Sequence, residues 1–209
     1  ADGNGAVGVA PDAKLLLAQI GQGVTYSSSI KTWTYSGTGI SAPALINALT
    51  WAEANGATVA NMSLGSSYDK TFQKGVTPLG SGVYKSPVAY GSMYGNTTKD
   101  LLAFAGASKT MALVASAGND RLPYAQFPGA YATQVDAKGN LVLGGRMLIV
   151  GSVGDNNVIS GFSNRAGSLC TALSGTTCKD PYYVKDFFVV APGEGIISSI
   201  ASSSRSNCT

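Results

Sequence analysis

The side chains of this sequence that could perform chemistry are few, and histidine is not among them. The 209 residues include three cysteines, 14 basic and 11 acidic residues and many hydroxyl groups, but no histidine. Serine–histidine–aspartate and cysteine–histidine catalysis both need an imidazole as general base near neutral pH. The composition therefore predicts that this chain cannot run either chemistry alone.

The cysteines are Cys170, Cys178 and Cys208, and the first two lie close together in a stretch rich in glycine, serine and threonine. A disulfide between Cys170 and Cys178 would close a short loop, and we expect Cys208 to stay unpaired. The alternative is that the cysteines are free buried thiols in a reducing compartment. Because the chain has no Cys-x-x-Cys pair and no histidine, the sequence argues against a zinc site.

Two short motifs match known sites but are not set in the surroundings that those sites need. Residues 3–8 fit Gly-x-Gly-x-x-Gly, the dinucleotide fingerprint, but no strand precedes them and Pro11 follows. Ser28 and Lys31 fit the Ser-x-x-Lys motif of β-lactamases without its companion motifs. We therefore expect neither nucleotide binding nor β-lactamase chemistry.

Apolar runs and helical periodicity alternate along the chain and predict an α/β fold. Continuous short apolar runs indicate buried strands, and apolar residues at helical spacing indicate helices. The expected strands are 14–20, 57–62, 111–117, 147–150 and 187–190; the expected helices are 98–108 and the segment between the N-cap Ser41 and Gly56; residues 21–39 and 65–96 are expected loops. Strands that are apolar throughout favour a parallel sheet covered on both faces.

The composition excludes several other classes of protein. Apolar residues make up 44% of the chain, charged residues 12%, and the net charge is +3. The basic residues are scattered, so we expect no nucleic-acid partner. No apolar run approaches the roughly 18 residues of a membrane span and no signal peptide opens the chain, so we expect no membrane contact by this segment.

Seven sets of residues, in order and with suitable spacing, resemble the subtilase family of serine proteases. They are residues 8–15, 48–52 with 60–65, 115–120, 127–129, 149–153, 161–164 and 190–193. The resemblance implies a three-layer subtilisin-like fold, with a mostly parallel sheet flanked by helices, in one peptidase domain whose segments 66–96 and 165–186 are inserted loops. The motif FSNRAG, followed by VVAPGEGI, is most similar to the corresponding sequences of autotransporter-type bacterial subtilases.

The catalytic motifs of the family are not found at the places that the resemblance gives them. Subtilases order their triad as Asp, His and Ser. Residues 37–43 look like the serine segment, but they occur too early in the chain, so Ser41 is better explained as a helix cap. We therefore expect an incomplete, central part of the peptidase domain, lying between the histidine and serine motifs and inactive alone.

The resemblance also implies which residues face the polypeptide substrate. Asn119 matches the oxyanion asparagine, whose side-chain amide donates to the developing negative oxygen. One edge that pairs with an extended substrate is assigned to Ser63, Leu64 and Gly65, and the opposing edge to Thr38, Gly39 and Ile40. Ala117 and Gly118 are expected to form a wall of the primary specificity pocket.

Asp2, Asn4 and Ala6 lie where some subtilases bind calcium through oxygen ligands. The remaining ligands would come from sequence outside this chain, so we predict no cofactor here and leave calcium open for the full-length parent.

If the serine helix and the aspartate strand of the family are missing, the strands should be uncovered on one side. We therefore expect Leu15, Leu17, Val59 and Val114 to be exposed or covered by another copy of the chain. The parent protein is expected to be a secreted or bacterial cell-surface endopeptidase. The rival hypotheses are a non-catalytic peptide-binding module derived from a subtilase and a small-molecule-binding α/β protein, which the failed fingerprint disfavours.

Overall fold

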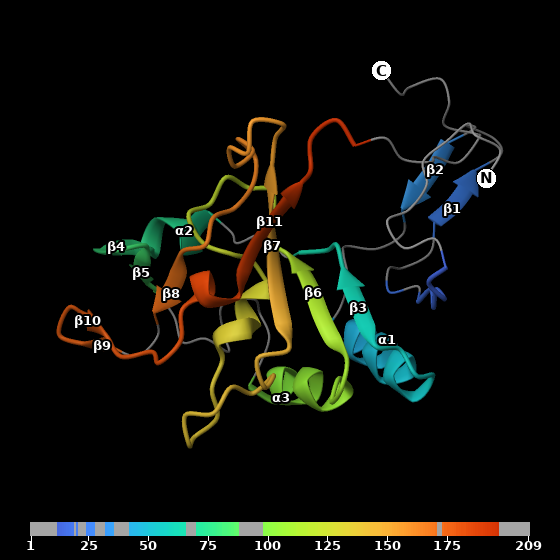
Figure 1. Ribbon diagram of the computed structural model, residues 1–209, viewed down its shortest axis with the longest axis horizontal. Coiled ribbons are helices and arrows are strands. Elements are labelled where there is room, and N and C mark those ends of the chain that lie inside the picture. Colours follow the sequence, from blue (N-terminus) through green and yellow to red (C-terminus); the bar gives the residue numbers. More distant parts are fainter. Residues whose placement is uncertain are drawn as a thin grey trace.

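The centre of the computed structural model is a sheet of four parallel strands (Figure 1). The structure describes residues 12–18, 20, 24–27, 32–35, 42–65, 70–87, 98–170 and 173–196. The strand order is β11-β7-β6-β3, and all three pairings are parallel. The strands are β3 (Val59–Met62), β6 (Ala112–Ser116), β7 (Met147–Val153) and β11 (Phe188–Pro192). The predicted α/β fold with a mostly parallel sheet is confirmed.

One face of this sheet carries the hydrophobic core. Because side chains alternate between the two faces of a strand, Leu113, Met147 and Ile149 point to the same side, and all are completely buried. The elements that contribute to this core are α1 (Ala42–Ala54), α3 (Thr98–Ala107) and the 3-10 helices η2 (Gly129–Thr133) and η3 (Val184–Phe187). Both α-helices agree with the predicted ones, although Ser41 lies outside the described residues.

The carboxyl end of α1 is fixed to the start of β6. Gly56 has a φ of +77°, the left-handed conformation that commonly follows the last helical turn, and its amide donates to the Glu53 carbonyl over 3.1 Å. The Glu53 carboxylate accepts hydrogen bonds from the Thr110 hydroxyl (2.7 Å) and amide (2.9 Å). The hydroxyl contact above all lowers the pKa of Glu53 below its usual value.

The other face of the sheet is not covered by any helix in the part of the chain that the structure describes. Val59 on β3 is 57% exposed, Leu148 on β7 and Val189 on β11 are also exposed, and Val114 on β6 is half-buried. Leu15 and Leu17, before the sheet, are 78% and 85% exposed. The expected exposure is confirmed for Leu15, Leu17 and Val59 and is partial for Val114.

Two predictions near the amino terminus are wrong. Residues 14–18 form no strand, because no described segment supplies the backbone partners that an apolar run needs to become one. Residues 21–39 were expected to be a loop, but β1 (Val24–Ser27) and β2 (Thr32–Tyr35) pair antiparallel within them. These two strands are rich in threonine and aromatic residues, which suit a pleated ladder even where no apolar run exists.

A second, smaller sheet occupies the segments that were expected to be inserted loops. It has the order β4-β5-β8, formed by β4 (Thr77–Gly80), β5 (Val83–Lys85) and β8 (Ser168–Cys170), and is preceded by α2 (Lys70–Gly75). Leu122, Tyr124 and Leu169 form its own buried cluster, against which Phe72 and Tyr84 pack. Both segments thus contain regular structure.

The predicted disulfide joins the hairpin that follows β8 to the last residue of β8. Strands β9 (Leu173–Ser174) and β10 (Thr177–Cys178) pair antiparallel, and Cys178 is bonded to Cys170. The free-thiol alternative for these two cysteines is therefore wrong, whereas Cys208 lies outside the described residues. None of the described helices has the length and apolar character needed to cross a membrane.

We predict that Cys178→Ala lowers the free energy of unfolding by about 2–3 kcal/mol, because the disulfide closes a loop with a sequence separation of 8 and so restricts the unfolded chain. Urea denaturation with and without a reductant measures the difference. The reductant should destabilise the wild type by a similar amount and leave the variant unchanged. A wild type that is indifferent to the reductant contradicts the prediction.

Candidate active site

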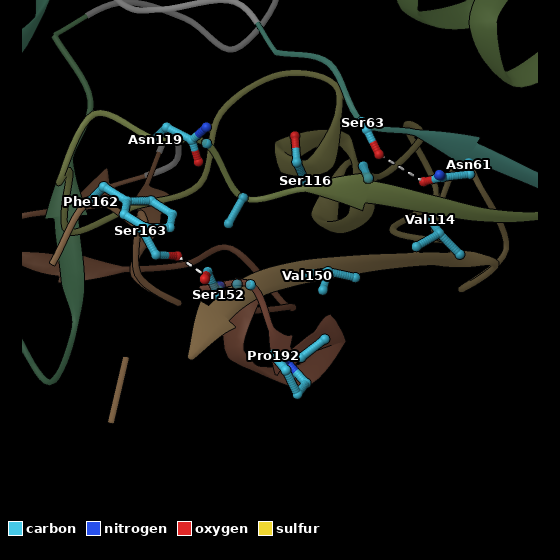
Figure 2. Close-up of a pocket in the computed structure, with 16 residues that line it drawn as sticks. Asn61, Ser63, Val114, Ser116, Asn119, Val150, Ser152, Phe162, Ser163 and Pro192 are labelled. Atoms are coloured by element: carbon cyan, nitrogen blue, oxygen red, sulfur yellow. Dashed lines mark hydrogen bonds between the residues drawn. The ribbon is translucent and has the colours of Figure 1, made fainter. Parts of the chain in front are cut away.

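A pocket of about 410 Å³ opens at the carboxyl ends of the four parallel strands, on the uncovered face of the sheet. Figure 2 shows its 16 lining residues, which come from the strand ends and from the turns that follow them. None of these residues carries a formal charge. In parallel α/β sheets this edge is where ligands usually bind, since the strand-to-helix turns all meet there.

Two predicted substrate-binding segments lie side by side at this pocket. Residues 63–65 follow β3, and residues 117–119 follow its neighbour β6. The Ser116 hydroxyl donates to the Leu64 carbonyl over 3.1 Å and so joins the two segments. Ser63, Ala117, Gly118 and Asn119 line the pocket, whereas the half-buried Leu64 and the exposed Gly65 do not.

Asn119 is exposed at the end of β6 and lines the pocket. The preceding Gly118 has a φ of +109°, which L side chains rarely adopt, and this turn directs the chain away from the sheet. A carboxamide supplies an uncharged donor, the group that stabilises an oxygen on which negative charge develops. Asn119 thus offers an accessible, uncharged donor at the pocket.

Asn164 is a completely buried polar residue behind this turn. Its Oδ1 accepts hydrogen bonds from the amides of Asp120 (3.0 Å) and Leu122 (2.9 Å), and its Nδ2 donates to the Ala117 carbonyl (3.1 Å). Asn164 belongs to the family-like segment 161–164, and its residue type alone predicted no role for it. A buried asparagine cannot be recognised from its type alone, since asparagine is usually a surface residue.

Gln126 is a second buried carboxamide that the sequence did not single out. Its side chain donates to the Asp120 carboxylate, and its backbone amide donates to the Ala117 carbonyl over 3.0 Å. A Cβ atom at Gly65 would lie 2.8 Å from the Gln126 Oε1, and one at Gly118 would collide with both Gln126 and Asn164. A side chain at Gly65 would therefore force the Gln126 carboxamide to shift, whereas Gly118, with its positive φ and two carboxamides beside it, requires glycine.

The serine hydroxyls around the pocket are engaged in local hydrogen bonds. Ser163 Oγ accepts from the Ser152 amide over 3.0 Å, and the Ser152 and Ser160 hydroxyls lie 2.7 Å apart. Ser63 Oγ donates to Asn61 Oδ1 over 3.2 Å. Because the chain contains no histidine, none of these hydroxyls has an imidazole base within it. The described pocket therefore offers hydrogen-bond donors but no serine activated by histidine.

Some predicted site residues fall outside the described part of the chain. These are Thr38, Gly39 and Ile40 on the second substrate edge and the calcium candidates Asp2 and Asn4. Within the described residues, one group of close metal-ligand types occurs, namely Cys170, Cys178 and Asp180. Two of its three members are joined as a disulfide, so their sulfurs are not thiolate ligands.

Comparison with known proteins gives one match to a family model and several similar structures. The model of the subtilase family matches residues 1–208. The prenylagaramide maturation protease PagA is 18% identical, with a TM-score of 0.42 and coverage of 76% of this chain and 39% of PagA. A mutant of the PatA protease domain is 20% identical, with a TM-score of 0.43 and coverage of 76% of this chain and 39% of the PatA chain.

The nisin leader peptidase NisP from Lactococcus lactis is 18% identical, with a TM-score of 0.35 and coverage of 62% of this chain and 36% of NisP. This chain therefore spans less than two fifths of the length of each of these three structures. No curated protein sequence matches it.

We predict that Gly118→Ala destabilises the protein by about 1–3 kcal/mol, since its φ of +109° and the carboxamides beside it exclude a Cβ atom. Gly106→Ala is the matched control, because Gly106 in α3 has no neighbouring atom within 4 Å of its would-be Cβ. In a helix that substitution is expected to stabilise by about 0.5–1 kcal/mol. Equal urea midpoints for the two variants would contradict this account of the turn.

Proposed function

Because this chain belongs to the subtilase family, we propose that it is the central part of a secreted serine endopeptidase that hydrolyses peptide bonds through an acyl-enzyme. In this proposal the serine nucleophile, the histidine base and the aspartate belong to the same protein outside this segment. The segment itself supplies the oxyanion donor and a surface that binds the polypeptide substrate.

The observation that carries the proposal is the position of Asn119. Its carboxamide lines an uncharged pocket at the carboxyl ends of the strands, next to the segment 63–65. When serine attacks a peptide carbonyl, the carbonyl oxygen gains negative charge, and a fixed donor stabilises it more in the transition state than in the substrate. Asn119 would therefore act on turnover rather than on substrate affinity.

The edge of the sheet supports an extended polypeptide as the substrate. Strand β3 is the last strand of the described sheet on its side, so residues 63–65 continue from an edge rather than from between two strands. An extended peptide can pair with such an edge as an added strand. The absence of charged side chains among the pocket-lining residues favours an uncharged substrate side chain there.

The missing imidazole and the uncovered face of the sheet support the proposal that the chain is one part of the enzyme. No histidine occurs in the sequence, and apolar side chains of three strands, such as Val59, Leu148 and Val189, are in contact with water. Because these side chains are about half exposed, covering each of them would contribute about 1 kcal/mol. We propose that the remainder of the enzyme covers the part of this face that lies outside the pocket lining, with self-association of the chain as the alternative.

The Cys170–Cys178 disulfide supports secretion or display on a bacterial surface, because disulfides persist in oxidising compartments. We also propose that the full-length protein is of the autotransporter type and binds a calcium ion, on the basis of sequence motifs and of Asp2 and Asn4.

A non-catalytic peptide-binding module is the second candidate function, and the absence of histidine is the observation that favours it. Such a module would have kept the pocket and the edge while losing the triad. The coding sequence on either side of this segment separates the two functions. Intact histidine and serine motifs of the family support the peptidase, and degenerate flanks support the binding module.

The isolated chain should have no endopeptidase activity and should not react with a serine-directed fluorophosphonate, because its hydroxyls have no imidazole base. Intact-mass spectrometry after incubation measures the labelling. The full-length enzyme, treated in parallel, is expected to take up one equivalent. Stoichiometric labelling of a serine in the isolated chain would refute the proposed division of roles.

In the full-length enzyme, Asn119→Ala should lower kcat with little change in KM. Removal of one such donor in a subtilisin costs about 10²–10³-fold, and we expect a loss of that order. Asn55→Ala is the control, since Asn55 is an exposed residue that caps α1 through a bond to the Trp51 carbonyl. Steady-state kinetics on a peptide substrate give both constants, and an unchanged kcat rules out the oxyanion assignment.

A further inference from the structure

The turn that carries Asn119 is held at both ends by one buried side chain. Asn164 lies in the segment after β7 and is completely buried. Its carboxamide bonds to the Ala117 carbonyl before Asn119 and to the amides of Asp120 and Leu122 after it. The backbone amide of Asn164 also donates to the Gly118 carbonyl over 2.9 Å.

The backbone of this turn needs such support. Gly118 has a φ of +109°, and Arg121, which is not a glycine, has a φ of +60°. Left-handed conformations of this kind are unfavourable for ordinary residues and persist only where the surroundings hold them. The contacts of Asn164 therefore fix a turn that the chain would not adopt by itself.

The chemistry of these contacts selects asparagine. One planar group must accept from two amides and donate to one carbonyl, and a carboxamide offers both functions in a fixed geometry. An aspartate would keep the acceptor and lose the donor, and an apolar side chain would deprive one buried and one part-buried amide of this partner.

We propose that Asn164 is a positioning residue of the reaction, which holds the turn 117–122 so that the Asn119 carboxamide points at the reacting carbonyl. Asn164 does not line the pocket, so it acts through Asn119 and not on the substrate. This inference rests on the peptidase function proposed above. It assigns to the buried carboxamide a share of the turnover number, in addition to its part in folding.

A double-mutant cycle in the full-length enzyme tests the role. Because a misplacement of about 1 Å costs up to roughly 10²-fold, Asn164→Ala is expected to lower kcat about 10- to 100-fold, with KM changed less than about twofold. In an Asn119→Ala background the same substitution should cost less than about twofold, since the donor that it positions is gone. An equal loss in both backgrounds, or no loss in either, overturns the proposal.

Amide hydrogen exchange gives a readout that does not depend on catalysis. Asn164→Ala should raise the exchange rates of the Asp120 and Leu122 amides about tenfold or more, as expected for a locally opened turn. Asn140→Ala is the control, because Asn140 is exposed and bonds only to Asp136 in its own turn. Unchanged exchange at the two amides overturns the holding role, whether or not the protein is a peptidase.

Asn164→Asp covers the case in which the alanine variant does not fold. It retains the acceptor for both amides but cannot, as a carboxylate, donate to the Ala117 carbonyl. In this variant we expect the Asp120 and Leu122 amides to stay protected and kcat to fall, the latter only while Asn119 is present. A kcat equal to that of the wild type overturns the proposal. If the full-length protein cleaves no peptide while exchange changes as expected, the proposed function fails and the hold on the turn stands.

Discussion

The burial of one face of a parallel sheet is the constraint on which the remaining features depend. Leu113, Met147 and Ile149 are withdrawn from water beneath α1, α3 and two 3-10 helices. Apolar burial of this kind is the dominant favourable term in folding. Because the strands run parallel, it also brings all their carboxyl ends to one edge, where the turns after β3, β6, β7 and β11 enclose the pocket. The site is thus a product of the topology.

Buried polar side chains add hydrogen bonds that apolar burial alone cannot supply. A turn that leaves a sheet exposes backbone amides and carbonyls, which must be satisfied when they are buried. Here the Asn164 carboxamide meets that need at Ala117, Asp120 and Leu122, and the Gln126 carboxamide donates to the Asp120 carboxylate beside them. Both side chains are buried, and they leave the neighbouring Asn119 facing the pocket. The same hydrogen bonds thereby satisfy the core and keep the site rigid.

The parts of the structure that sequence predicts well are those set by local patterns. Patterns within a few residues predicted the apolar strands β6 and β7, the helix that ends before Gly56 and the pair Cys170 and Cys178. The predictions that failed concern segments whose structure depends on partners distant in sequence. Residues 14–18 are apolar but find no described strand to pair with.

For the site, the order of family-like segments predicted Asn119 and residues 63–65, and the structure brings Asn119 and Ser63 to one pocket. The roles of Asn164 and Gln126 could not be predicted, because they depend on burial and on contacts across 42 and 6 positions of the chain. Neither residue type signals such a role by itself.

The disulfide of the β9–β10 hairpin has a consequence for survival among proteases. Gly175 and Thr176, at the tip of this hairpin, are exposed and lie between the two bonded cysteines. Exposed loop tips are the preferred sites of proteolytic nicking. A cut there would leave both new ends attached through sulfur, with β8 still paired to β5. A chain exposed to proteases would thus tolerate cleavage at this tip without losing either fragment.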